Sequence, residues 1–177
     1  DIDVALLSGV NEIVLTGVNL GSWGRDMGVE HTLSDLIFKI MDRFSPERLR
    51  LSSLEPWDVD ESFFPIFGHP SFCHHLHLPL QAGSDFILKR MLRKMRTKNF
   101  RDLVDRIRGI IPDVAITTDI MVGFPGESDE EFEKSIRFVR EMNFAGGHVF
   151  RYSPRAGTAA IRLDQQISEA KKKDRSS

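Results

Sequence analysis

Short apolar runs alternate with longer amphipathic stretches along the 177 residues, and this alternation constrains the fold more than any other feature. The apolar runs predict five strands: Glu12–Thr16, Arg48–Ser52, His75–Leu80, Val114–Val122 and Gly147–Tyr152. Four stretches between them carry apolar residues at helical spacing: 31–44, 84–95, 97–110 and 128–142. Strands that alternate with helices are typical of parallel α/β folds, so we expect one parallel sheet with its strands in sequential order.

The two faces of single strands differ in polarity, which favours the wall of a barrel. In Val114–Val122, Thr117 and Asp119 alternate with Ile116 and Ile120. The leucines of the preceding strand alternate in the same way with histidines. We expect the apolar faces to pack on the helices and the polar faces to line a full or partial TIM-like barrel.

Composition and charge indicate a folded soluble domain, with 41% hydrophobic and 28% charged residues. The net charge of -2 creates no field that would attract a polyanion, so nucleic acid would bind locally or through another segment. No apolar run reaches the length of a membrane span, and the first residues do not have the pattern of a secretory leader, so we predict a cytoplasmic protein without a membrane partner. Residues 1–7 resemble the end of a helix, so we interpret the chain as a fragment. We expect a core over residues 1–165 and a frayed tail over 166–177.

Cysteine is represented by Cys73 alone. One thiol excludes a disulfide within the chain, and it cannot by itself hold a thiolate zinc site or an iron-sulfur cluster. His75 and His77 lie on a strand without a carboxylate cluster, which favours hydrogen bonding inside a barrel over metal binding. We therefore predict no metal site within these residues.

Each predicted strand is followed by a turn rich in glycine, proline and polar residues, at 16–24, 52–58, 79–85, 122–128 and 152–158. Ordinary turn chemistry would explain any one of them. Because the carboxyl ends of parallel barrel strands lie at one end, we expect the five turns to converge there around a polar small-molecule ligand. The glycines would let backbone amides approach that ligand closely.

The sequences of these turns are similar to successive motifs of the radical-SAM methylthiotransferases. The resemblance extends from Gly9 to Gln165 and rests on GVNEIVLTGVNLGSWGRD, RLRLSSLEPWDVDESFF, HLHLPLQAGSDFILKRMLRKM, AITTDIMVGFPGESDEEFEKSIRFVREMNF and HVFRYSPRAGTAA. TGVNLGSWGRD and LSSLEPWD most resemble the branch that modifies N6-threonylcarbamoyladenosine in tRNA. The resemblance implies a partial, open (β/α)6 TIM-like barrel, here without its first strand and cluster loop, that binds S-adenosylmethionine across its strand ends.

The resemblance also implies a set of cofactor-binding residues: Gly17, Val18, Asn19, Glu55, Gln81, Arg93, Asp119, Val122, Gly123, Phe124 and Pro125. The first three would meet the methionyl amino group, and Glu55 would face the cofactor. Gln81 and Asp119 would accept hydrogen bonds from the ribose hydroxyls. Arg93 would hold the methionyl carboxylate, which suits a guanidinium fork, and residues 122–125 would face the adenine.

One feature of the family is missing from these 177 residues. The family holds a [4Fe-4S] cluster with a C-x-x-x-C-x-x-C motif, and Cys73 matches none of its ligands. In the family the reduced cluster cleaves S-adenosylmethionine to a radical that activates a C–H bond. We therefore interpret the chain as the cluster-less part of a catalytic core, inactive by itself, and assign no catalytic residue.

The implied partners are tRNA and an electron-donor protein, with Tyr152 and Arg155 as candidate substrate contacts. Two other interpretations stay open. One is the related branch that methylthiolates an aspartate of a ribosomal protein. The other is a non-catalytic ligand-binding barrel.

Overall fold

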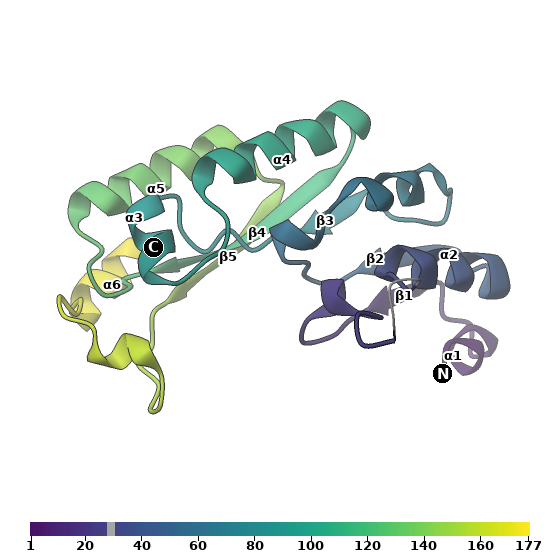
Figure 1. The fold of residues 1–177 in the computed structure, drawn as a ribbon, viewed down its shortest axis with the longest axis horizontal. Helices are drawn as coiled ribbons and strands as arrows, with labels where there is room; N and C mark the ends of the chain where they lie inside the picture. The colour runs from purple at the N-terminus through teal and green to yellow at the C-terminus, as the bar shows by residue number, and fades with distance from the viewer. Residues whose placement is uncertain (28–30) are drawn as a thin grey trace. The chain divides into compact units, whose positions relative to one another are not determined.

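The computed structural model describes residues 1–27 and 31–177 (Figure 1). These residues form two compact units. Unit 1 comprises Asp1–Leu78 and Arg106–Ile116, and unit 2 comprises Pro79–Asp105 and Thr117–Ser177.

Unit 1 is built around two parallel strands, β1 (Glu12–Leu15) and β2 (Arg48–Leu51), paired in register with Leu15 opposite Leu51. The strand β3 (His75–His77) follows β2 and joins it through an isolated parallel bridge between Ser53 and His77. The helices of this part of the chain are α1 (Ile2–Leu7), η1 (Leu20–Ser22), α2 (Leu33–Phe44), η2 (Pro56–Asp58) and η3 (Glu61–Gly68).

The helix α2 shows why the sequence folds locally as predicted. The Thr32 hydroxyl accepts a hydrogen bond from the Asp35 N–H, and the Asp35 carboxylate accepts one from the Thr32 N–H at 2.9 Å. This reciprocal cap satisfies two of the otherwise unpaired amides at the start of the helix. Ile37 and Met41, one turn apart, are almost fully buried, so the apolar stripe of the sequence is the packed face.

Unit 2 contains most of β4 (Ala115–Val122) and all of β5 (Gly146–Arg151), which pair in parallel with Asp119 opposite His148. Helix α5 lies along one face of these two strands (Figure 1). The helices after β3 are α3 (Asp85–Arg90), α4 (Thr97–Ile110), α5 (Asp129–Met142), η4 (Ala159–Arg162) and α6 (Glu169–Arg175).

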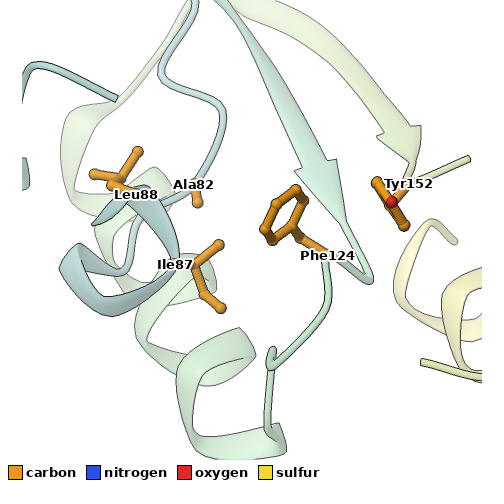
Figure 2. Packing of buried hydrophobic residues seen from close by; sticks show 5 residues of the cluster. All are labelled: Ala82, Ile87, Leu88, Phe124 and Tyr152. Carbon is orange, nitrogen blue, oxygen red and sulfur yellow. The ribbon is translucent and has the colours of Figure 1, made fainter. Parts of the chain in front are cut away.

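The predicted difference between strand faces is confirmed in β4. Its residues alternate between half-buried and buried, with Thr117 and Asp119 on the half-buried face and Ile116 and Ile120 buried. The aromatic residues that follow β4 and β5, Phe124 and Tyr152, pack together in the core with residues of α3 (Figure 2). Thr117 and Asp119 therefore lie on the less buried face of β4, while Ile116 and Ile120 belong to the core.

The five predicted strands are present, but the single sheet that we expected is not. The structure has a two-stranded sheet, β1-β2, and a three-stranded sheet in the order β3-β4-β5. The third strand, predicted to reach Leu80, ends at His77. Pro79 explains this because proline has no N–H to continue a ladder. The connection between β2 and the β3 region is correspondingly reduced to isolated bridges.

The end of the chain also differs from the prediction of a frayed tail. Residues Glu169–Arg175 form α6, with the Ser168 hydroxyl accepting a hydrogen bond from the Lys171 N–H. Lys172 and Arg175 are buried, on the same face of the helix. A run of lysines and an arginine predicts side chains exposed to solvent. Two of these side chains instead form ion pairs within unit 2.

Candidate cofactor-binding site

The predicted residues of unit 1 follow the carboxyl ends of β1 and β2. Gly17, Val18 and Asn19, which we call the β1 turn, are exposed, and the Asn19 carbonyl accepts hydrogen bonds from the N–H and hydroxyl of Ser22. Glu55 is half-buried at the start of η2. Because β1 and β2 are parallel and in register, these residues follow the same edge of that sheet. Their contacts with a cofactor stay a prediction.

Gln81 and Asp119, the predicted ribose pair, lie on adjacent segments of unit 2. The Gln81 N–H donates to the Asp119 carbonyl at 2.8 Å, and the Met121 N–H donates to the Gln81 carbonyl at 2.8 Å. Gln81 has a φ of 71°. The Asp119 side chain is 23% exposed, and its Oδ1 lies 3.3 Å from Nδ1 of His148. Two groups that can accept hydrogen bonds from hydroxyls are thus placed on neighbouring segments.

Arg93 follows α3, half-buried, and its guanidinium donates a hydrogen bond to the Pro79 carbonyl at 2.9 Å. This contact ties the arginine to the segment that leads into Gln81. Arg93 therefore lies beside the segment that leads into Gln81. Its role as a carboxylate ligand stays a prediction.

The segment Val122–Glu127, which we call the β4 turn, is buried along its whole length. Gly123 and Gly126 have φ values of 74° and 89°, in the left-handed region that favours glycine. The backbone of the turn is bonded on several sides. The Tyr152 N–H donates to the Val122 carbonyl, the Gly126 N–H to the Gln165 carbonyl, and Arg90 Nε to the Pro125 carbonyl, each at 2.9 Å.

Glu127 closes the β4 turn through its side chain. Its Oε1 accepts hydrogen bonds from the Gly123 N–H at 2.8 Å and from Nη1 of Arg175 at 2.6 Å. Burial raises the pKa of Glu127, while the Gly123 N–H and Arg175 act in the opposite direction. The side chains of Glu127 and Arg175 are 1% and 2% exposed, so this ion pair is fully enclosed.

Sequence reasoning missed the part played by Arg90 and Arg175. Arg175 pairs with a residue 48 positions earlier, and Arg90 contacts a carbonyl 35 positions later. Neither pairing has a local pattern, so a single sequence offered no signal for them.

The two candidate substrate contacts have different surroundings. Tyr152 is 6% exposed, and its ring centroid lies 5.2 Å from that of Phe124 (Figure 2). Lys172 Nζ lies 5.2 Å from the centroid of the Tyr152 ring. Within the described residues its buried hydroxyl has no hydrogen-bond partner. Arg155 is exposed in the loop after β5. Substrate contact by either residue stays a prediction.

The residues present do not fit a [4Fe-4S] cluster held by three thiolates. Cys73 is 8% exposed, and burial raises the pKa of its thiol, which disfavours the thiolate that iron needs. Over residues 1–27 and 31–177, no three His, Cys, Asp or Glu side chains gather as metal ligands do. In the same part of the chain, no helix has the length and apolar character needed to cross a bilayer.

The family model described as the Radical SAM superfamily matches residues 7–139, about three quarters of the chain. The chain belongs to the radical SAM superfamily. This radical SAM chain is 45% identical over 172 residues to the threonylcarbamoyladenosine tRNA methylthiotransferase MtaB of Thermotoga maritima, covering 96% of the chain and 39% of the relative. It is 42% identical over 168 residues to a tRNA-2-methylthio-N(6)-dimethylallyladenosine synthase of Thermoanaerobacter pseudethanolicus, covering 94% and 36%. It thus spans little more than a third of either relative.

Solved structures agree on the fold. The radical SAM chain superposes on coproporphyrinogen III oxidase of Escherichia coli with a TM-score of 0.72 at 17% identity, covering 93% of the chain and 38% of that enzyme. For the methyltransferase TsrM of Kitasatospora setae, the TM-score is 0.65 at 15% identity, with 85% and 29% covered. The fold class, α/β as in a partial, open TIM-like barrel, is confirmed.

Proposed function

We propose that this radical SAM chain is part of an enzyme that transfers a methylthio group to N6-threonylcarbamoyladenosine in tRNA. The observation that carries the proposal is the pairing of Gln81 and Asp119 beside the packed β4 turn, in a chain whose relatives are tRNA methylthiotransferases. The identity to MtaB supports the threonylcarbamoyl branch, and the tRNA substrate is taken from the names of both relatives.

We assign the ribose, carboxylate and adenine of S-adenosylmethionine to residues of unit 2. Asp119 and Gln81 would accept from the ribose hydroxyls, and Arg93 would pair with the methionyl carboxylate. The backbone groups of the β4 turn described above are hydrogen-bonded within the protein. We therefore assign residues 122–125 the role of a packed wall against which the adenine lies. S-adenosylmethionine supplies the radical chemistry when it is bound, and these residues orient it and keep water away.

The residues assigned to the methionyl amino group and Glu55 belong to unit 1. Gly17, Val18 and Asn19 offer exposed backbone to the amino group, and Glu55 offers a carboxylate to a cationic cofactor. Tyr152 and Arg155 are the candidate contacts for the tRNA substrate. The whole enzyme would work in the cytoplasm with an electron-donor protein.

We also propose that these 177 residues by themselves hold no cluster and do not cleave S-adenosylmethionine, because a single buried thiol cannot replace three thiolates. Anaerobic reconstitution with iron and sulfide checks this. We expect a colourless protein, and a brown protein with four irons per chain would contradict the proposal.

The cofactor assignment is tested by titrating S-adenosylmethionine into the full-length, cluster-loaded protein and its Asp119→Ala and Arg93→Ala variants, by anaerobic calorimetry. We expect each variant to bind about ten- to a hundredfold more weakly, because a hydrogen bond that involves a charged group contributes about 1.5 to 3 kcal/mol. Asp105→Ala, at an exposed position of α4, is the matched control and should bind as the unchanged protein does. If Asp119→Ala and Arg93→Ala also bind normally, the residue assignment is wrong.

The branch is tested by supplying the same protein with tRNA that carries N6-threonylcarbamoyladenosine, or with the ribosomal protein whose aspartate is modified in the related branch. We expect methylthio transfer to the tRNA only. Transfer to the protein would support the alternative branch, and transfer to neither substrate would leave the ligand-binding barrel as the better interpretation.

A further inference from the structure

Helix α6 packs directly on the β4 turn. Arg175 Nη1 donates to the Glu127 carbonyl at 2.9 Å and to its Oε1 at 2.6 Å, while Nη2 donates to Asp129 Oδ1 at 2.8 Å. The same Glu127 oxygen accepts the Gly123 N–H. Arg175 therefore holds the end of the turn at Glu127 directly, and it holds the beginning of the turn at Gly123 through the Glu127 side chain.

A second residue of α6 lies over the beginning of the turn, at Gly123. Lys172 is 2% exposed, and a Cβ added to Gly123 would clash with Lys172 Cγ. The ammonium group of Lys172 lies over the Tyr152 ring and also pairs with Glu169 at 2.7 Å. The aliphatic part of the lysine thus fills the space that a side chain at position 123 would need.

These contacts are made by residues outside the range that the superfamily model matches. The family model ends at residue 139, whereas α6 begins at Glu169. The wall of the proposed adenine site is consequently held in place by residues that the superfamily match does not include.

We infer that α6 acts as a clamp that sets the shape of the adenine wall, with Arg175 and Lys172 as positioning residues for the cofactor. The inference rests on the proposed function, because it assumes that the β4 turn faces the adenine of S-adenosylmethionine. Neither residue needs to touch the cofactor. Their effect is transmitted through Glu127 and Gly123, and a wall that is already in place binds more tightly than one that must first be ordered.

The test uses the full-length, cluster-loaded protein and compares two probes, S-adenosylmethionine and methionine, by anaerobic calorimetry. Methionine lacks the adenosine moiety and so reports on the rest of the site. For Arg175→Ala we expect S-adenosylmethionine to bind about tenfold more weakly, because the β4 turn would then have to be ordered when the cofactor binds. Methionine should bind as it does to the unchanged protein. Arg175→Lys, which keeps the charge, should recover part of the affinity, and Lys173→Ala, at the exposed neighbouring position, should bind normally.

A second set of variants keeps the test valid if Arg175→Ala does not fold. Gly123→Ala introduces a methyl group against Lys172 Cγ, and Lys172→Ala removes that atom. We expect Gly123→Ala to weaken the binding of S-adenosylmethionine and the double variant to bind more tightly than Gly123→Ala alone. This rescue would not occur if α6 contributed only general stability.

The outcomes distinguish a failure of the proposed function from a failure of the clamp. If the unchanged protein fails to bind S-adenosylmethionine, the proposed function fails and the clamp fails with it. If the unchanged protein binds, but neither the Arg175 variants nor the Gly123 and Lys172 pair changes the preference for S-adenosylmethionine over methionine, the clamp alone is wrong.

Discussion

The β1 turn and the β4 turn both follow parallel strands, yet they are held in very different ways. The β1 turn is exposed, with Val18 fully accessible, and the Asn19 carbonyl receives its hydrogen bonds from Ser22, three residues away. The β4 turn is buried, and its contacts come from α3, β5 and α6, as far as 48 residues along the chain. The difference indicates that the conformation of the β4 turn is set by distant parts of the chain. The hydrogen bonds of the Asn19 carbonyl are local, so we expect the backbone of the β1 turn to change conformation at a lower cost.

The largest expected effect is on the stability of the β4 turn. Arg175→Ala would leave the Glu127 carboxylate buried without its counter-ion, which we expect to lower the free energy of unfolding by about 3 to 5 kcal/mol. Urea unfolding of the 177-residue chain, followed by circular dichroism, measures this loss.

Lys173→Ala removes a similar charge from an exposed position of the same helix and should change stability by less than about 0.5 kcal/mol. Equal stabilities for the two variants would show that the β4 turn does not depend on its distant partner, and the contrast between the turns would disappear.

A smaller effect should separate the glycines of the two turns. Gly123→Ala places a side chain at a φ of 74° against Lys172, and we expect it to cost about 2 kcal/mol. An alanine Cβ at Gly17 would lie 3.8 Å from Leu20, an ordinary contact, so Gly17→Ala should stay within about 0.5 kcal/mol of the unchanged chain. The same urea series compares them. A Gly17 variant as costly as the Gly123 variant would mean that the β1 turn is as rigid as the β4 turn.

The strands and the larger helices could be predicted because their signals are local. The alternation in Val114–Val122 reports directly on burial, and Thr32 ahead of an apolar stripe marks the start of α2. The division into two sheets and the docking of α6 could not be predicted in this way. They depend on contacts between distant residues, such as Glu127 with Arg175, and a lysine-rich segment looks the same in sequence whether or not it finds such a partner.

For the candidate site, the sequence could name residues whose contacts with a cofactor stay a prediction. The resemblance picked out Gln81 and Asp119, which the structure places on adjacent segments. It gave no information about what supports the β4 turn, since Arg90 and Arg175 act through the backbone and through Glu127.

The clamp has a consequence for where this protein can be divided. The sequence suggested a core that stops at residue 165, and the superfamily match stops earlier still, at 139. A polypeptide cut at either position would retain Glu127 and lose Arg175, so a carboxylate built into the interior would have no cation to balance it. We therefore expect the smallest stretch that folds around the β4 turn to include α6, because boundaries drawn from motif similarity alone would separate Glu127 from Arg175.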